Sequence, residues 1–167
     1  MSDSENICLA CGLCCDGTLI GFVQLEREEL SAVRKIMDVE EVKGNAIFLH
    51  PCPKLCDGCT VYSQRPKQCG IFKCGLLNSV EQNEMDFNSA VKMVDSVKQK
   101  KSAIEQLILT QQIQLRSPSF YFKMVELKKL LKKVKSESIL TQGHLELISE
   151  LNELDSLLEK EFDLTLD

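Results

Sequence analysis

The chain has 167 residues, of which 44% are hydrophobic, and it carries a net charge of −5. This composition is typical of a globular protein with a buried core, and it argues against a disordered chain and against a basic nucleic-acid surface. No apolar run approaches the roughly 18 residues of a membrane span, and the first residues, MSDSENICLACG, are acidic and polar, unlike a signal peptide. We therefore expect a cytoplasmic protein with neither a membrane nor a nucleic-acid partner.

Cysteine usage is the outlier of the composition. The chain has nine cysteines and none after position 74. A disulfide framework is expected in secreted proteins and usually needs an even number of cysteines, so it does not suit this chain. Clustered thiols in a reducing compartment favour metal ligation instead.

The first cluster, CLACGLCC, begins at Cys8. Cys8, Cys11 and Cys14 are separated by two-residue gaps, which let thiolates converge on one metal centre, and Gly12 allows backbone amides to approach the sulfurs. The adjacent side chains of Cys14 and Cys15 diverge. The doublet therefore predicts either two metal centres or one cysteine that is not a ligand.

Few regular elements are expected between the two cysteine clusters. An extended segment over residues 19–25 precedes a helix over residues 26–37, and a short strand follows over residues 46–49. The predicted apolar face of the helix consists of Leu30, Val33, Ile36 and Met37.

The second cluster places five more thiols between residues 52 and 74. They are Cys52, Cys56, Cys59, Cys69 and Cys74. Cations in the same stretch outnumber its one acid, Asp57, and cations can offset the surplus negative charge of a thiolate centre. Arg65 is the cation that we single out, and His50 is a candidate substitute ligand.

The residues after Gly75 are expected to be helical, because glycine and proline become rare there. The first predicted stripe is Phe87, Ala90, Val94, Val97, Ile104 and Ile108. Ser117 and Pro118 have the residue types of an N-cap and a first helical position, and the next stripe is Phe120, Met124, Leu127, Leu131 and Val134. After a polar turn over residues 135–138, the third stripe is Leu140, Leu147, Leu151, Leu154 and Leu158.

The sequence thus predicts a mainly α protein. A small, irregular, metal-stapled cysteine-rich module over residues 1–75 is followed by an antiparallel arrangement of about three helices over residues 76–167. The stripes are interpreted as core packing, and docking of a protein partner on these helices is the alternative.

The cysteine spacing also carries a family resemblance. CxxCxxCC near the N-terminus is followed by a Cys-Pro pair and by the motif Cys59-x-x-Tyr62-x-x-Arg65-Pro66-x-x-Cys69. Over about residues 8–74 this resembles the CxxCxxCC cysteine-cluster family, described as zinc- or iron-chelating and related to the cluster region of flagellin lysine N-methylase. The helical region after Gly75 is expected to lie outside the resemblance.

The resemblance implies a ligand set. The family cysteines would be Cys8, Cys11, Cys14, Cys15, Cys52, Cys59, Cys69 and Cys74. Tyr62 and Arg65 would accompany the ligands without being ligands. Cys56 departs from the family pattern and is either an additional ligand or an idle thiol.

The residues leave the identity of the metal open. Cys8, Cys11 and Cys14 have the spacing of a ferredoxin-type triplet, and Cys52 followed by Pro53 could supply the remote fourth ligand of an iron–sulfur cluster. Eight thiolates would equally fill two tetrahedral zinc sites, and one cluster with one zinc ion is a third arrangement.

The predicted function is metal binding in a redox or accessory module. One alternative, from the resemblance, is a methyltransferase-related enzyme, and another is a structural zinc domain in an interaction scaffold. We find no glycine-rich nucleotide loop, His–acid constellation or nucleophile motif in the sequence, so enzymatic activity is left open.

Overall fold

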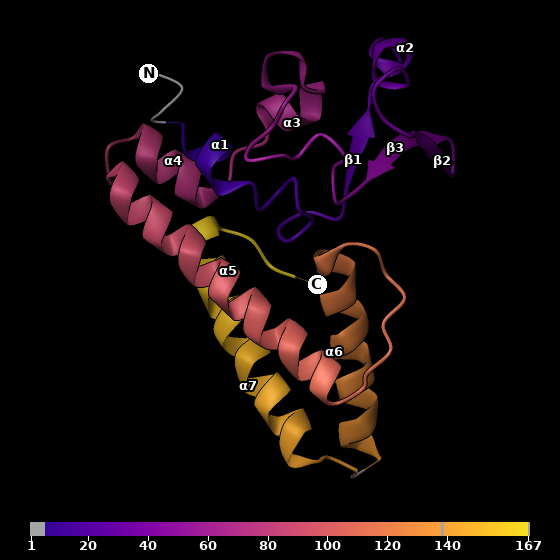
Figure 1. The fold of residues 1–167 in the computed structure, drawn as a ribbon, viewed down its shortest axis with the longest axis vertical. Helices are drawn as coiled ribbons and strands as arrows, with labels where there is room; N and C mark the ends of the chain where they lie inside the picture. Colours follow the sequence, from indigo (N-terminus) through magenta and orange to yellow (C-terminus); the bar gives the residue numbers. More distant parts are fainter. Residues whose placement is uncertain (1–5, 138, 167) are drawn as a thin grey trace. The chain divides into compact units, whose positions relative to one another are not determined.

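The computed structural model describes residues 6–137 and 139–166 and divides into two compact units. The cysteine unit comprises the described residues up to Lys73 together with Pro118–Tyr121, and the helical unit comprises the remainder, from Cys74 onward. Helices dominate and one small sheet is present, so the predicted mainly α class is confirmed (Figure 1). None of the described helices is long and apolar enough to cross a membrane.

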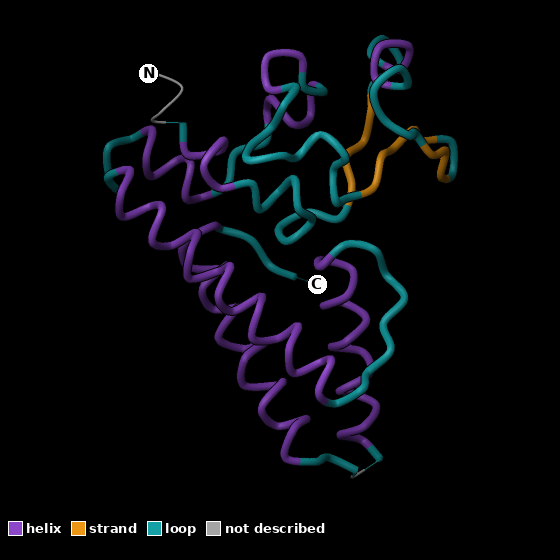
Figure 2. The backbone as a smooth tube through the Cα atoms, in the orientation of Figure 1, coloured by secondary structure: helices purple, strands orange, loops and turns teal. Residues whose placement is uncertain are grey.

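The sheet of the cysteine unit has three short antiparallel strands. Their order is β1 (Phe22–Leu25), β3 (Asn45–Leu49) and β2 (Glu40–Val42), drawn orange in Figure 2. β1 and β3 coincide with the predicted extended segments, and Phe22 pairs with Leu49. β2 was not predicted, because all three of its residues are exposed and give no alternating pattern.

The helices of the cysteine unit are short. They are α1 (Ile7–Cys11), α2 (Leu30–Val33), the 3-10 turn η2 (Tyr62–Gln64) and α3 (Lys67–Ile71). The helix predicted over residues 26–37 is therefore wrong in length. Val33 and Met37 are buried as expected, but the Glu29 side chain does not cap α2, and residues after Val33 continue as turns.

The core of the cysteine unit combines side chains of β1 and β3 with side chains of α2 and of the segments that follow α2 and β3. Its buried members are Val23, Leu25, Val33, Met37, Phe48 and Cys52. Cys15 and Cys69 pack against this cluster, so thiols and apolar side chains share one core.

The helical unit is built around three long helices. They are α5 (Phe87–Thr110), α6 (Phe120–Ser136) and α7 (Gln142–Leu157), preceded by α4 (Gly75–Glu81) and followed by a π-helical turn, η3 (Leu158–Phe162). Figure 1 shows that α7 runs antiparallel to α5 and α6, and that residues 111–119 return the chain so that α5 and α6 run the same way.

Most of the predicted stripe residues form the core of this unit. Ala90, Val94, Val97, Ile104, Ile108, Met124, Leu127, Leu131, Leu147, Leu151, Leu154 and Leu158 are all buried. Ion pairs join the helices at the edge of the core: Lys100 on α5 binds Glu150 and Glu153 on α7, and Lys128 on α6 binds Asp155. The helical periodicity therefore predicted the correct faces.

The predicted cap at Ser117 is wrong, because α6 begins at Phe120. The carboxylate of Glu126 accepts hydrogen bonds from the backbone amides of Arg116 at 3.0 Å and Ser117 at 3.3 Å, and from the Ser117 hydroxyl at 3.1 Å. Ser117 is thus held by a side chain within α6 and does not cap its first turn. In the turn predicted over residues 135–138, Ser138 lies outside the described residues.

Thr141 caps α7, and its substitution tests this capping box. The Thr141 hydroxyl accepts from the His144 amide at 3.3 Å, and His144 Nδ1 accepts from the Thr141 amide at 3.2 Å. We expect Thr141→Ala to lower the free energy of unfolding by about 1 kcal/mol and Thr141→Ser to lower it less, as measured by urea unfolding. Equal losses in both variants would contradict a role for the hydroxyl.

Candidate metal centre

The nine cysteines come from different elements. Cys8 and Cys11 lie on α1, Cys69 lies on α3, and Cys74 is the N-cap residue of α4 in the helical unit. The other five lie outside the helices and strands, and Cys59 forms an isolated bridge with Leu55. Cys52 is buried, Cys8 and Cys56 are exposed, and the remaining thiols are partly buried.

Four of these thiols form a mutually interacting group in the cysteine unit. This four-cysteine group consists of Cys15, Cys52, Cys59 and Cys69. Burial, followed by the charges of the other three members, raises the pKa of the Cys15 thiol to about 12. Burial, with added contributions from Cys52 and Cys59, raises the pKa of Cys69 to about 11. Because charge interactions weaken with distance, these effects indicate that the thiols lie within range of one another's charges.

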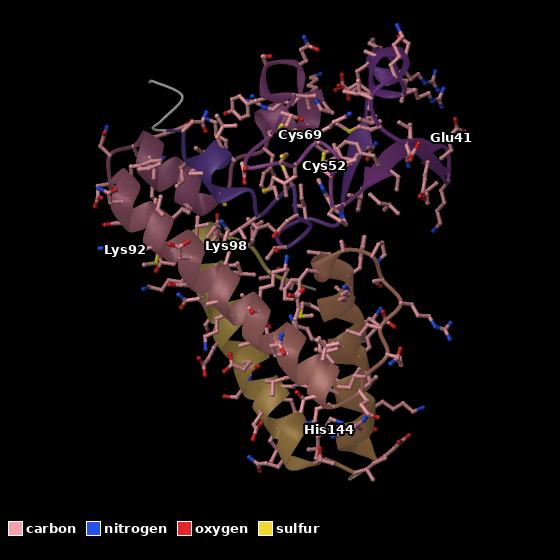
Figure 3. All side chains as sticks on the ribbon, viewed as in Figure 1. Glu41, Cys52, Cys69, Lys92, Lys98 and His144 are labelled. Atoms are coloured by element: carbon pink, nitrogen blue, oxygen red, sulfur yellow. The ribbon has the colours of Figure 1, made fainter. Side chains whose placement is uncertain are left out.

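Backbone contacts fix two members of the group. The Cys52 amide donates to the Cys15 carbonyl oxygen at 2.7 Å, and His50 Nδ1 lies 3.2 Å from the same oxygen. Since a carbonyl can only accept, Nδ1 of His50 carries the hydrogen. The antiparallel pairing of β1 with β3 brings Cys15 and Cys52 close together, because Cys15 precedes β1 and Cys52 follows β3 at the same end of the ladder. Figure 3 shows Cys52 and Cys69 in one region with sulfur atoms around them.

Gly17 shapes the turn that carries Cys15. Its φ of +79° is the left-handed conformation that glycine adopts at little cost. A Cβ atom there would lie 2.9 Å from the Ser119 Cβ, and the Gly17 carbonyl accepts from the Tyr121 amide at 2.8 Å. Residues 118–121 therefore belong to the environment of the CxxCxxCC turn within the cysteine unit.

The donor set fits a metal that prefers sulfur. Burial raises the pKa of Cys52 as well, so Cys15, Cys52 and Cys69 favour the neutral thiol unless a cation compensates the charge of the thiolate. A bound metal supplies that charge and holds cysteine as the thiolate. In the described part of the chain, no three Cys, His, Asp or Glu side chains stand close enough together to hold one ion. The four-cysteine group is thus a set of donors and not a closed coordination shell.

Cys8, Cys11, Cys14 and Cys74 were also predicted as ligands, and they stay predictions. Cys56 is exposed and, with Cys59, lines an open cavity of about 390 Å³ between α1 and residues 56–60. The predicted ferredoxin-type site combined Cys52 with Cys8, Cys11 and Cys14, and it stays a prediction. The contact of Cys52 that the structure defines is with Cys15.

Tyr62 and Arg65 contact each other, and Arg65 acts on Cys69. Their role as residues that accompany the ligands stays a prediction. The Arg65 guanidinium carbon is 3.9 Å from the Tyr62 ring centroid, and its charge opposes the effect of burial on the pKa of Cys69. Sequence reasoning missed Asn6, which caps α1 and also donates to the Tyr62 hydroxyl at 2.7 Å. Asparagine directly before a short apolar helix was the available signal.

His50 was predicted as a substitute ligand, and its position is now defined. The side chain is 3% exposed, and its ring packs edge-on against Phe48. Nδ1 donates to the Cys15 carbonyl oxygen, while Nε2 is buried and has no hydrogen-bond partner among the described residues. The contacts of His50 therefore orient the Cys15 backbone, and its role as a ligand stays a prediction.

Comparison with known proteins gave one match. Residues 7–105 match the model of the CxxCxxCC family, described as "Putative zinc- or iron-chelating domain". No curated protein and no solved structure matches the chain. The match ends within α5, so the expectation that the region after Gly75 lies outside the family was wrong.

Proposed function

Because this chain belongs to the CxxCxxCC family of zinc- or iron-chelating domains, we propose that it holds one metal centre through Cys15, Cys52, Cys59 and Cys69. The observation that carries the proposal is that Cys15, Cys52 and Cys69 share one core, with the Cys52 amide hydrogen-bonded to the Cys15 carbonyl oxygen at 2.7 Å. The effects of the four thiols on one another's pKa values support the inclusion of Cys59. Four thiolates complete a tetrahedral zinc site or anchor one iron–sulfur cluster.

Four protein ligands also restrict what the centre does. When all positions of a metal are taken by thiolates, none is open for substrate or for an activated water. The centre therefore either stabilises the fold or carries electrons, which is the role of a redox or accessory module. The residues of the chain contribute by burying the sulfurs against Val23, Phe48 and the rest of the core. The methyltransferase alternative rests on the resemblance alone.

Metal analysis of cysteine variants tests this proposal. The protein would be purified anaerobically from cells supplied with iron and zinc, and its metal, acid-labile sulfide and absorbance would be measured. We expect about one centre per chain, and we expect Cys15→Ala and Cys69→Ala to lose most of the metal, because each removes one of four ligands. Cys56→Ala is the matched control and should keep its metal, because Cys56 is exposed and outside the four-cysteine group.

The outcomes separate the candidate centres. Colourless protein with zinc supports a structural centre, and iron with matching sulfide supports an electron-carrying cluster. Protein that holds neither metal would contradict the proposal. An equal loss in Cys56→Ala and Cys69→Ala would contradict the assigned ligands.

A further inference from the structure

The guanidinium group of Arg65 is held in place by Tyr62. Nη1 of Arg65 donates to the Tyr62 carbonyl oxygen at 2.7 Å, and the guanidinium carbon lies 3.9 Å from the ring centroid. The Tyr62 hydroxyl in turn accepts a hydrogen bond of 2.7 Å from Asn6 Nδ2. Asn6, Tyr62 and Arg65 thus form a chain of contacts from the N-terminus of α1 to the guanidinium group.

One donor of this ordered group has no acceptor. Nε of Arg65 is buried and makes no hydrogen bond within the described part of the chain. A buried donor without a partner costs about 1–3 kcal/mol, so such atoms are rare in native proteins and call for an explanation. The ordering by Tyr62 indicates that the position of Nε is maintained in spite of this cost.

The neighbours of Nε identify a candidate acceptor. A Cβ atom at Gly70 would lie 3.6 Å from Nε, so Nε faces the backbone of α3 at the residue after Cys69. Arg65 directly precedes Pro66, the N-cap residue of α3, and the Pro66 carbonyl oxygen accepts from the Gly70 amide at 3.1 Å, so this short helix begins beside Arg65. Cys69 is the member of the four-cysteine group that adjoins this point of α3, and its sulfur is the candidate acceptor for Nε.

We propose that Arg65 is a positioning residue whose Nε donates a hydrogen bond to the Cys69 sulfur when that sulfur binds metal. The inference rests on the proposed function of the four-cysteine group. Hydrogen bonds to ligating atoms disperse the negative charge of a thiolate centre and orient its ligands, and the loss of such a partner typically weakens metal binding 10–100-fold. Arg65 would thereby set how long the centre retains its metal, with Tyr62 and Asn6 holding the guanidinium group in position.

Zinc release from the full chain tests this role. Zinc-loaded wild type and variants would be mixed with excess pyridylazoresorcinol, and the rate of zinc transfer followed by absorbance. We expect Arg65→Met to release zinc about 10–100-fold faster than wild type, since it removes both charge and donor. Arg65→Lys should be intermediate, because lysine keeps the charge but lacks the planar guanidinium fork. Arg34→Met is the control, because Arg34 is an exposed arginine of the same unit that pairs with Glu41.

A purely structural role of Arg65 predicts different results. Urea unfolding of the same samples would show which variants are fully folded under the assay conditions. Zinc release would then be compared only among those variants. Release from Arg65→Met at the wild-type rate, with lower stability alone, would overturn the inference. If Arg65→Met does not fold, Arg65→Lys decides: faster release at unchanged stability supports the inference, and unchanged release overturns it. A wild-type chain that binds no zinc or iron would instead overturn the proposed centre.

Discussion

Removal of the metal is expected to unfold the cysteine unit and to leave the helical unit folded. The cysteine unit has strands of three to five residues and a small core in which Cys52 is itself a member. Cores of this size rarely stabilise a fold alone, and the free energy of metal binding then becomes folding free energy. Hydrogen exchange of the full chain, followed by mass spectrometry, should show amides of β1 and β3 losing protection after chelation, while α5 and α7 keep theirs.

Reconstitution is the control for this experiment. The protection of β1 and β3 should return when the chelator is replaced by the metal that the protein originally held. Unchanged protection in the metal-free protein would mean that the apolar core suffices, and the centre would then not be structural. Loss of protection in α5 and α7 as well would contradict the separate stability of the helical unit.

The helices of the helical unit were largely predictable from the sequence, because the spacing of apolar residues within each helix determines which face is buried. Apolar residues at three- and four-residue spacing must lie on one face of a helix, and the stripes of α5, α6 and α7 are buried accordingly. The start of α6 was not predictable in the same way. Ser117 is a residue type that often caps helices, but its amide and hydroxyl donate to the carboxylate of Glu126 instead. The sequence contains many acidic residues, and nothing in it singles out Glu126 as this acceptor.

The grouping of the thiols depends on contacts that are distant in the sequence. Two-residue gaps suggested that Cys8, Cys11 and Cys14 act together, and this grouping stays a prediction. The interaction of Cys15 with Cys52, Cys59 and Cys69 was not predicted from the spacing. The antiparallel register of β1 and β3 brings Cys15 to Cys52, and cysteine spacing contains no information about that register. The contact between Tyr62 and Arg65 is local instead, because the two residues are separated by only two positions in the motif that also contains Cys59 and Cys69.

Leu154→Ala is expected to be among the most destabilising substitutions in the helical unit. The Leu154 side chain on α7 is fully buried, with 0% exposure. Truncation removes buried methyl groups and leaves a cavity that packed helices close only in part, which typically costs about 2–5 kcal/mol. Urea unfolding followed by far-ultraviolet circular dichroism, in which the long helices dominate the signal, measures this loss.

Leu145→Ala is the matched control for this substitution. It makes the same chemical change on the same helix at a side chain that is 50% exposed, so its cost should stay within about 0.5 kcal/mol. Because all of the four-cysteine group lies in the other unit, both variants should carry wild-type amounts of metal under conditions in which they are folded. Equal destabilisation by the two substitutions would contradict the burial of the Leu154 face, and loss of metal from folded Leu154→Ala would show that the helices contribute to the centre.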